Sequence, residues 1–142
     1  MKSRVVIAGG GIASIETALA LRDLAGDRVE AKIFSPRRDF VYRPYAVGEP
    51  YGTAHVANYD LRDLAARCGA GFHQDSIAAV DSETRLVTTH DGEKFSYDSL
   101  VVAPGAQLLW PVPGAITFWG IADELDVQKV MERLRGGELH SP

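Results

Sequence analysis

The sequence has very little cysteine, with only Cys68 among its 142 residues. One cysteine excludes an intramolecular disulfide, a cysteine cluster for zinc and a CxxC redox pair, and it is typical of a reducing compartment. We therefore expect a cytoplasmic location and a buried structural thiol. The histidines do not show metal-ligand spacing either, so no metal site is predicted. They are His55, His73, His90 and His140.

An excess of positive charge is also missing, because 15 Lys and Arg residues stand against 19 Asp and Glu residues, for a net charge of -4. Such a chain has no positive field to attract phosphate backbones, so we expect no nucleic-acid partner. The one long uncharged stretch, residues 99–122, is interrupted by several prolines and glycines. These residues would leave backbone groups unsatisfied in lipid, so we expect no transmembrane segment.

What the sequence does contain begins with a βαβ pattern in its first 36 residues. Residues 5–8 form an unalternated apolar run, which is typical of a strand buried on both faces of a parallel sheet. Three glycines follow, and apolar residues at helical spacing then predict a helix from Ile12 to a cap at Gly26. A second strand is expected over residues 29–34, closed by Ser35 and Pro36. The sequence therefore predicts an α/β fold.

The remainder predicts further elements of the same fold class. Residues 37–59 lack periodicity and are expected to form a long functional loop. A short helix over 60–68 and a third strand over 70–74 follow. Three β-prone runs, at 76–80, 85–89 and 94–97, predict a small antiparallel meander, and Asp91-Gly92 is a strong hairpin signal. A buried strand over 100–103 and an amphipathic helix over 123–134 complete the prediction.

The most informative motif is the run from Gly9 to Ser14, a variant of GxGxxG. In this motif Gly9 can turn tightly and Gly11 lets the backbone approach a pyrophosphate. The helix that begins near Ile12 then points its N-terminal N–H groups at that anion. Ser14 replaces the third glycine, where a small residue is needed for packing of the helix on the strand. A glycine turn that binds nothing is the alternative, but the flanking strand and helix favour a dinucleotide site.

The end of the second strand departs from this motif, because Ser35 stands where an acidic residue usually holds the ribose hydroxyls. Arg37 and Arg38 follow directly. A serine with arginines can bind the 2′-phosphate of NADP, so a small NADP-binding module is an alternative interpretation. A solvated loop is the third interpretation of the two arginines.

The order of these features resembles the N-terminal part of the FAD-binding domain of pyridine nucleotide-disulfide oxidoreductase-type flavoproteins. Within them it is most similar to the type-II NADH dehydrogenase and sulfide:quinone reductase branch. The resemblance rests on residues 5–14, residues 38–44, residues 100–106 and Pro113-Gly114. It implies a Rossmann-like FAD/NAD(P)-binding fold, incomplete relative to the full family. Residues 1–110 would be the N-terminal part of the FAD-binding domain, and 111–142 would lead towards a missing NAD(P)H-binding domain.

The resemblance implies a FAD-dependent oxidoreductase that passes hydride from NAD(P)H to FAD and then reduces a quinone or another acceptor. We expect this segment alone to be inactive, and no residue stands out as catalytic. The alternatives are the NADP-binding module and a non-catalytic oligomeric remnant, since an unpaired sheet edge favours self-association. The full-length protein could also lie at the inner face of the membrane.

The same resemblance implies a cofactor role for each matching position. Ser14 would line the pyrophosphate, Ser35 with Arg37 or Arg38 would face the adenosine ribose, and the loop at Arg43 would approach the flavin. The complete expected cofactor-binding set is Gly9, Gly10, Gly11, Ile12, Ala13, Ser14, Ser35, Pro36, Arg37, Arg38, Arg43, Pro44, Ser76, Ile77, Ala103, Pro104, Gly105 and Ala106.

Overall fold

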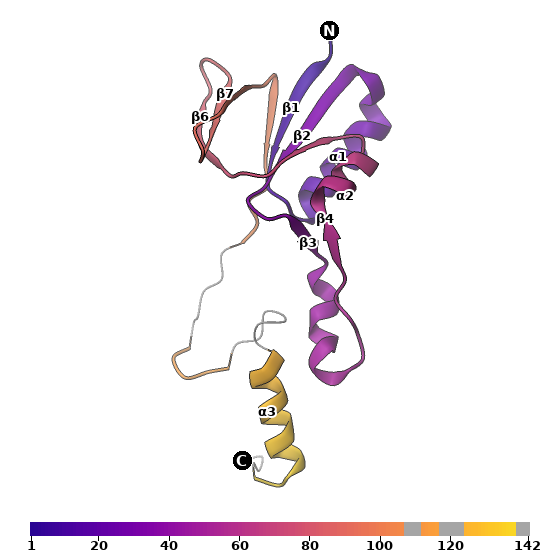
Figure 1. Cartoon of the computed structure of the whole chain (residues 1–142), viewed down its shortest axis with the longest axis vertical. Helices are drawn as coiled ribbons and strands as arrows, with labels where there is room; N and C mark the ends of the chain where they lie inside the picture. Colours follow the sequence, from indigo (N-terminus) through magenta and orange to yellow (C-terminus); the bar gives the residue numbers. More distant parts are fainter. Residues whose placement is uncertain (107–111, 117–123, 139–142) are drawn as a thin grey trace. The chain divides into compact units, whose positions relative to one another are not determined.

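The computed structural model describes residues 1–106, 112–116 and 124–138 of the chain (Figure 1). The chain divides into two compact units. The first comprises Met1–Phe40 and Asn58–Ala106, and the second comprises Val41–Ala57 and Gln107–Pro142. Among the described residues, no helix combines the length and the apolar character needed to cross a membrane.

A four-stranded parallel sheet with the order β5-β2-β1-β9 forms the centre of the first unit. Its strands are β1 (Ser3–Ala8), β2 (Val29–Phe34), β5 (Gly71–His73) and β9 (Ser99–Val102). β1 pairs with β2 from Ser3 to Ala8 and with β9 from Val5 to Ala8. Val5, Val6 and Ile7 of the apolar run are buried and Ala8 is half-buried, in agreement with the lack of alternation that predicts a central strand.

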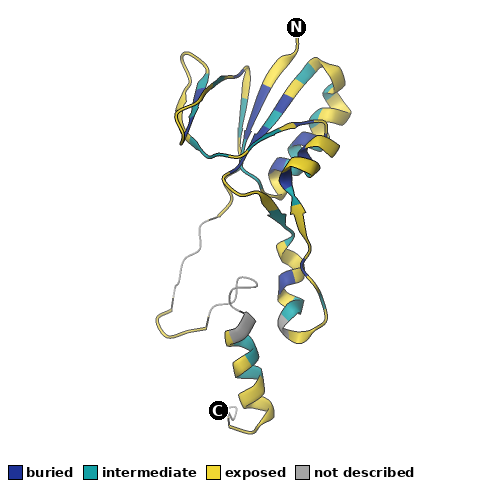
Figure 2. Cartoon of the chain, in the orientation of Figure 1, coloured by how far each residue is buried: buried dark blue, intermediate teal, exposed yellow. Residues whose placement is uncertain are grey.

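Two helices cover one face of this sheet, α1 (Ile12–Ala25) and α2 (Leu61–Arg67), and a short 3-10 helix, η1 (Gly26–Arg28), follows α1. Ser14 and Ala18 are the buried residues of α1. They lie four residues apart on one side of the helix, and their small side chains let it approach the strands closely. Figure 2 shows the buried residues of the strands and helices in dark blue, and part of them form the core of this face. It comprises Val5, Ile7, Ala18, Ala31, Ile33, Ala65, Cys68 and Ala70.

Burial of Cys68 in this core confirms the prediction of a buried thiol. The same burial raises the pKa of the thiol, which disfavours the reactive thiolate. Cys68 directly follows α2, and Gly69 adopts a left-handed φ of 74° after it. The helix therefore ends at Arg67, one residue before the end that the sequence predicts.

A three-stranded antiparallel sheet packs on the other face and confirms the predicted meander. Its strands are β6 (Ile77–Asp81), β7 (Leu86–Thr89) and β8 (Lys94–Ser96). Val87 and Tyr97 join Val6 and Phe34 in a second buried cluster, and the rings of Phe34 and Phe95 meet edge to face with centroids 5.0 Å apart. The parallel sheet is therefore covered on both faces.

The interpretation of residues 37–59 as one irregular loop is wrong. The structure contains β3 (Asp39–Val41), the 3-10 helix η2 (Arg43–Tyr51) and β4 (Asn58–Asp60) in this segment, and β3 pairs with β4. Such short elements carry no hydrophobic period, which is why the sequence pattern misses them. Elsewhere η1 is an additional short element, and the other differences are boundaries: α2 begins at Leu61, β5 is shorter than expected, and α3 covers Glu124–Arg135. Residue 123 of the predicted terminal helix lies outside the described residues.

We expect Ile33→Ala to lower the free energy of unfolding by about 2–5 kcal/mol, because Ile33 is fully buried and the substitution leaves a cavity. Urea denaturation of the full chain measures this change. Leu24→Ala is the control, since Leu24 is 79% exposed on α1 and should cost less than about 0.5 kcal/mol. Equal losses for the two variants would contradict this core.

Candidate functional site

The carboxyl ends of β1, β2 and β9 meet at one edge of the parallel sheet. The N–H of Gly9 donates to the carbonyl of Phe34 at 2.8 Å, and the N–H of Ala103 donates to the carbonyl of Ala8 at 2.8 Å. These bonds bring the glycine-rich loop, Ser35 and the segment after β9 to the same edge. Ligands of open α/β sheets bind outside this edge, which is where these predicted residues lie.

Two of the three glycines are required by contacts inside the protein. Gly9 has a φ of +137°, and a Cβ atom there would overlap the carbonyl oxygen of Ala103. A Cβ atom on Gly10 would overlap the Oγ of Ser35 and would lie 2.8 Å from Cδ1 of Leu61. Glycine is therefore required at position 9 by its positive φ and by the close approach of the Ala103 backbone. At position 10 it is required by the close packing of Ser35 and Leu61.

Gly11 differs from its neighbours, because none of the described residues other than Gly10 and Ile12 has an atom within 4 Å of the position that its Cβ would take. Its φ of -94° is open to any residue, so neither packing nor backbone strain requires glycine there. It is also the N-cap of α1, which has no side-chain cap hydrogen bond. The first-turn N–H groups of an uncapped helix end suit an anion, and the open space lets one approach.

Ser14 lies on the buried side of the first turn of α1, with no exposed surface. Its Oγ has no hydrogen-bond partner among the described residues, and it would lie 3.2 Å from a Cβ on Gly9. The third position of the motif is therefore tightly packed and admits only a small side chain, as the sequence pattern predicts.

The residue that follows β2 is a buried serine, where the motif usually has a carboxylate. Ser35 is 2% exposed, its N–H donates to the carbonyl of His73 at 3.2 Å, and its Oγ accepts the N–H of Arg37 at 3.2 Å. The hydroxyl hydrogen of Ser35 can still be donated to an oxygen of a ligand.

The two arginines after β2 have different surroundings. Arg38 donates from Nε to Oδ2 of Asp60 at 3.0 Å, and this hydrogen bond is the largest cause that lowers the pKa of Asp60. Arg37 is exposed and takes part in no ion pair among the described residues. Arg37 is thus the arginine whose charge is available at this edge. Sequence reasoning could not separate the two, because only the fold brings Asp60 beside Arg38.

The remaining residues of the predicted cofactor-binding set lie in several different elements and loops. Ser76 already uses its backbone, since its N–H is bonded to Asp75 and its carbonyl accepts the N–H of His90 at 2.9 Å. Ile77 begins β6, and Gly105 follows β9 with a φ of +79°. Arg43 and Pro44 begin η2 and belong to the second unit. Ile12 and Ala13 form the first turn of α1, and Pro36, Pro104 and Ala106 are exposed.

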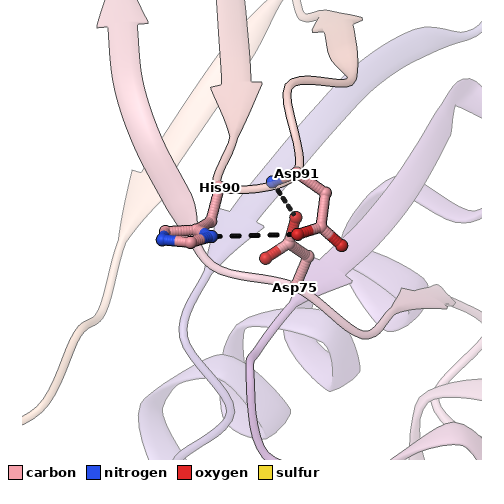
Figure 3. A group of neighbouring side chains, drawn as sticks. All are labelled: Asp75, His90 and Asp91. Atoms are coloured by element: carbon pink, nitrogen blue, oxygen red, sulfur yellow. Dashed lines mark hydrogen bonds and ion pairs between the residues drawn. The ribbon is translucent and has the colours of Figure 1, made fainter.

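Asp75, His90 and Asp91 form a cluster of potential metal ligands, with one ligand atom of each within 4.8 Å of the others (Figure 3). Internal contacts account for this arrangement. One carboxylate oxygen of Asp75 accepts the N–H of Ser76 at 2.7 Å, and the other accepts the N–H of Asp91 at 2.9 Å. His90 and Asp91 are exposed. Asp75 therefore holds the turn after β7 in place through these two hydrogen bonds. The bond from the N–H of Asp91 is the largest cause that lowers the pKa of Asp75.

Comparison with known proteins agrees with this architecture. A family model described as pyridine nucleotide-disulphide oxidoreductase matches residues 3–135. The sulfide-quinone reductase of Aquifex aeolicus is 30% identical over 116 residues, a match that covers 80% of this chain and 27% of that protein. An NADH dehydrogenase-like protein of Mycobacterium tuberculosis is 29% identical, and the match covers 98% of this chain and 37% of that protein.

Solved structures show the same fold. The sulfide:quinone oxidoreductase of Aquifex aeolicus superposes with a TM-score of 0.79 at 26% identity, over 94% of this chain and 32% of that chain. NDH2 of Plasmodium falciparum, solved in complex with NADH, superposes with a TM-score of 0.68 at 21% identity, over 98% of this chain and 31% of that chain. The sequence thus spans about a third of the length of these relatives.

We expect Asp75→Asn to destabilise the chain near neutral pH, because an amide oxygen replaces a pair of carboxylate acceptors. The lowered pKa of Asp75 means that its contribution is present above the unfolded-state pKa of about 4 and is lost as the pH falls through the folded-state value. The variant should therefore lose less stability on acidification than the wild type. Urea denaturation between pH 3 and pH 7, in roughly one-unit steps, measures both effects.

Asp91→Asn is the matched control, because Asp91 contributes its backbone N–H to Asp75 and its own side chain is exposed. If the wild type and Asp75→Asn lose the same free energy of unfolding on acidification, the hydrogen bonds of Asp75 are not a source of pH-dependent stability.

Proposed function

The chain belongs to the pyridine nucleotide-disulphide oxidoreductase family, and we propose that it is the FAD-binding portion of a flavin-dependent NAD(P)H oxidoreductase. The observation that carries this proposal is the open space at Gly11, in front of an uncapped helix end at the carboxyl edge of a parallel sheet. The unpartnered hydroxyl of Ser14 lies in the same turn. A dinucleotide pyrophosphate has the negative charge that suits such a helix end.

In this proposal, Gly11 and the first-turn N–H groups of Ile12 and Ala13 hold the pyrophosphate of FAD. Ser35 donates its hydroxyl hydrogen to the adenosine ribose, and the exposed guanidinium of Arg37 supplies the positive charge at that end. When bound, the flavin supplies the hydride and electron chemistry. The residues of this chain bind and orient the cofactor.

We further propose NAD(P)H as the donor and a quinone as an acceptor in the whole protein. The names of two similar proteins, a sulfide-quinone reductase and an NADH dehydrogenase-like protein, support these substrate classes. Because the chain spans about a third of their length, we propose that it retains the cofactor without turning over substrates on its own.

A visible absorption spectrum of the purified full chain, after incubation with FAD and removal of the excess, tests the proposal. We expect a flavin spectrum, with FAD released on heating. A folded chain that takes up no flavin would contradict the proposal. Binding of NADPH in preference to NADH by a flavin-free chain would support the NADP-binding module instead, for which the free charge of Arg37 and the hydroxyl of Ser35 are the favouring features.

We expect Gly11→Val to weaken FAD binding by more than about tenfold, a loss of at least about 1.4 kcal/mol. The valine side chain enters open space, so the fold tolerates it while the approach of the pyrophosphate is blocked. Fluorescence titration of FAD measures the affinity, and thermal denaturation verifies that the variant folds. Gly11→Ala is the graded control and should have a smaller effect. Undiminished FAD binding by a folded Gly11→Val variant would place the cofactor elsewhere.

Two expectations from the sequence stay predictions: the domain boundary near residue 110, and the cytoplasmic or membrane-peripheral location of the protein. Self-association is a further one, and its structural basis is β9, which forms one end of the four-stranded sheet. Light scattering of the purified chain measures it, and a clean monomer would argue against the oligomeric alternative.

A further inference from the structure

We propose that Asp60 is a positioning residue for the glycine-rich loop, acting through Arg38 and Leu61 without touching the cofactor. The inference has a structural part, which links Asp60 to the loop, and a functional part, which rests on the proposed binding of FAD. The structural part follows from a continuous set of contacts in the first unit.

The first contacts fix the start of α2. Asp60 is the N-cap of this helix, and its Oδ1 accepts the N–H groups of Arg62 at 2.8 Å and Asp63 at 3.2 Å. Capping of this kind satisfies N–H groups that the helix itself leaves without partners. The position of Leu61, the first residue of α2, is therefore set by Asp60.

The second contacts join this helix start to the segment that follows β2. The Oδ2 of Asp60 accepts a hydrogen bond from Nε of Arg38 at 3.0 Å, while the carbonyl of Arg38 accepts the N–H of Leu61 at 2.8 Å. A side-chain bond and a backbone bond thus tie the same short segments together. Ser35 lies only three residues before Arg38, so the tie acts on the segment that carries the predicted ribose contact.

The third contact reaches the glycine-rich loop. Leu61 is fully buried, and its Cδ1 lies 2.8 Å from the position that a Cβ on Gly10 would take. Ser35 is the other close neighbour of that position. Gly10 therefore rests on side chains from both tied segments. A shift of α2 relative to the end of β2 must therefore move Leu61 relative to Ser35, and with them the packing beneath Gly10.

An ion pair of the same type elsewhere on the sheet provides a matched control. Asp98 accepts hydrogen bonds from Arg4, including one from Nε at 3.3 Å, and both pairs are partly exposed. Arg4 lies in the first half of β1, at the opposite end of the strand from the glycine-rich loop. Breaking this pair changes the surface charge in the same way but leaves the support of Gly10 intact.

The test compares the full chain with Asp60→Asn, Arg38→Ala, the double variant and the control Asp98→Asn. Asparagine caps a helix about as well as aspartate, so Asp60→Asn retains the cap and removes the charged acceptor of Arg38. Two quantities are measured: the FAD dissociation constant, and the hydrogen-exchange rates of the loop amides at residues 9–11 in the cofactor-free chain. Thermal denaturation reports the stability of each variant.

We expect Asp60→Asn and Arg38→Ala each to raise the FAD dissociation constant by about fivefold, the upper range for one exposed ion pair. The double variant should show no larger effect than either single variant, because both remove the same link. The loop amides should exchange faster in these variants. Asp98→Asn should leave both quantities unchanged, because its partner Arg4 does not contact the support of Gly10.

The outcomes separate the inference from the proposed function. A wild-type chain that binds no FAD overturns the proposed function, and the exchange rates still decide whether Asp60 positions the loop. Exchange rates in Asp60→Asn and Arg38→Ala that equal those of the wild type overturn the structural part. Faster exchange with an unchanged FAD dissociation constant overturns the functional part. If Asp98→Asn changes the FAD dissociation constant and the loop exchange rates as much as Asp60→Asn does, the effect comes from a general loss of charge and the inference is overturned.

Discussion

Parallel pairing of β1 with β2 on one side and with β9 on the other places both the core and the candidate site. Because these strands run parallel, their carboxyl ends lie at the same edge. A parallel sheet must also be covered on both faces, and here helices supply one cover while the antiparallel meander supplies the other. The core and the candidate site are therefore consequences of the same strand order.

The glycine-rich loop shows how one short motif serves separate physical requirements. Gly9 meets a steric requirement between strands, and Gly10 meets a packing requirement above Ser35 and Leu61. Gly11 meets neither, because its surroundings are open. A glycine that the fold does not need is most simply explained by something that approaches from outside, which is why this position carries the functional argument.

Among the described residues, tertiary contacts decide which of the two arginines after β2 has an unpaired charge. Arg38 is paired with Asp60, which also caps α2, whereas Arg37 stays exposed beside the buried Ser35. One of two adjacent arginines thus stabilises the scaffold and the other remains available to a ligand. The family match covers most of this chain, while the chain covers about a third of the length of the relatives.

Four features could be predicted from the sequence alone: the α/β class, the buried strand before the glycines, the short helix that precedes Gly69, and the meander with its turn at Asp91-Gly92. These features depend on local periodicity and on residues with restricted backbone preferences, which are readable in one dimension. Only the tertiary structure decided the strand order, the short elements between residues 37 and 59, and the different surroundings of Arg37 and Arg38. These depend on contacts between residues far apart in the chain, such as Arg38 with Asp60 and Gly10 with Leu61, which no local pattern encodes.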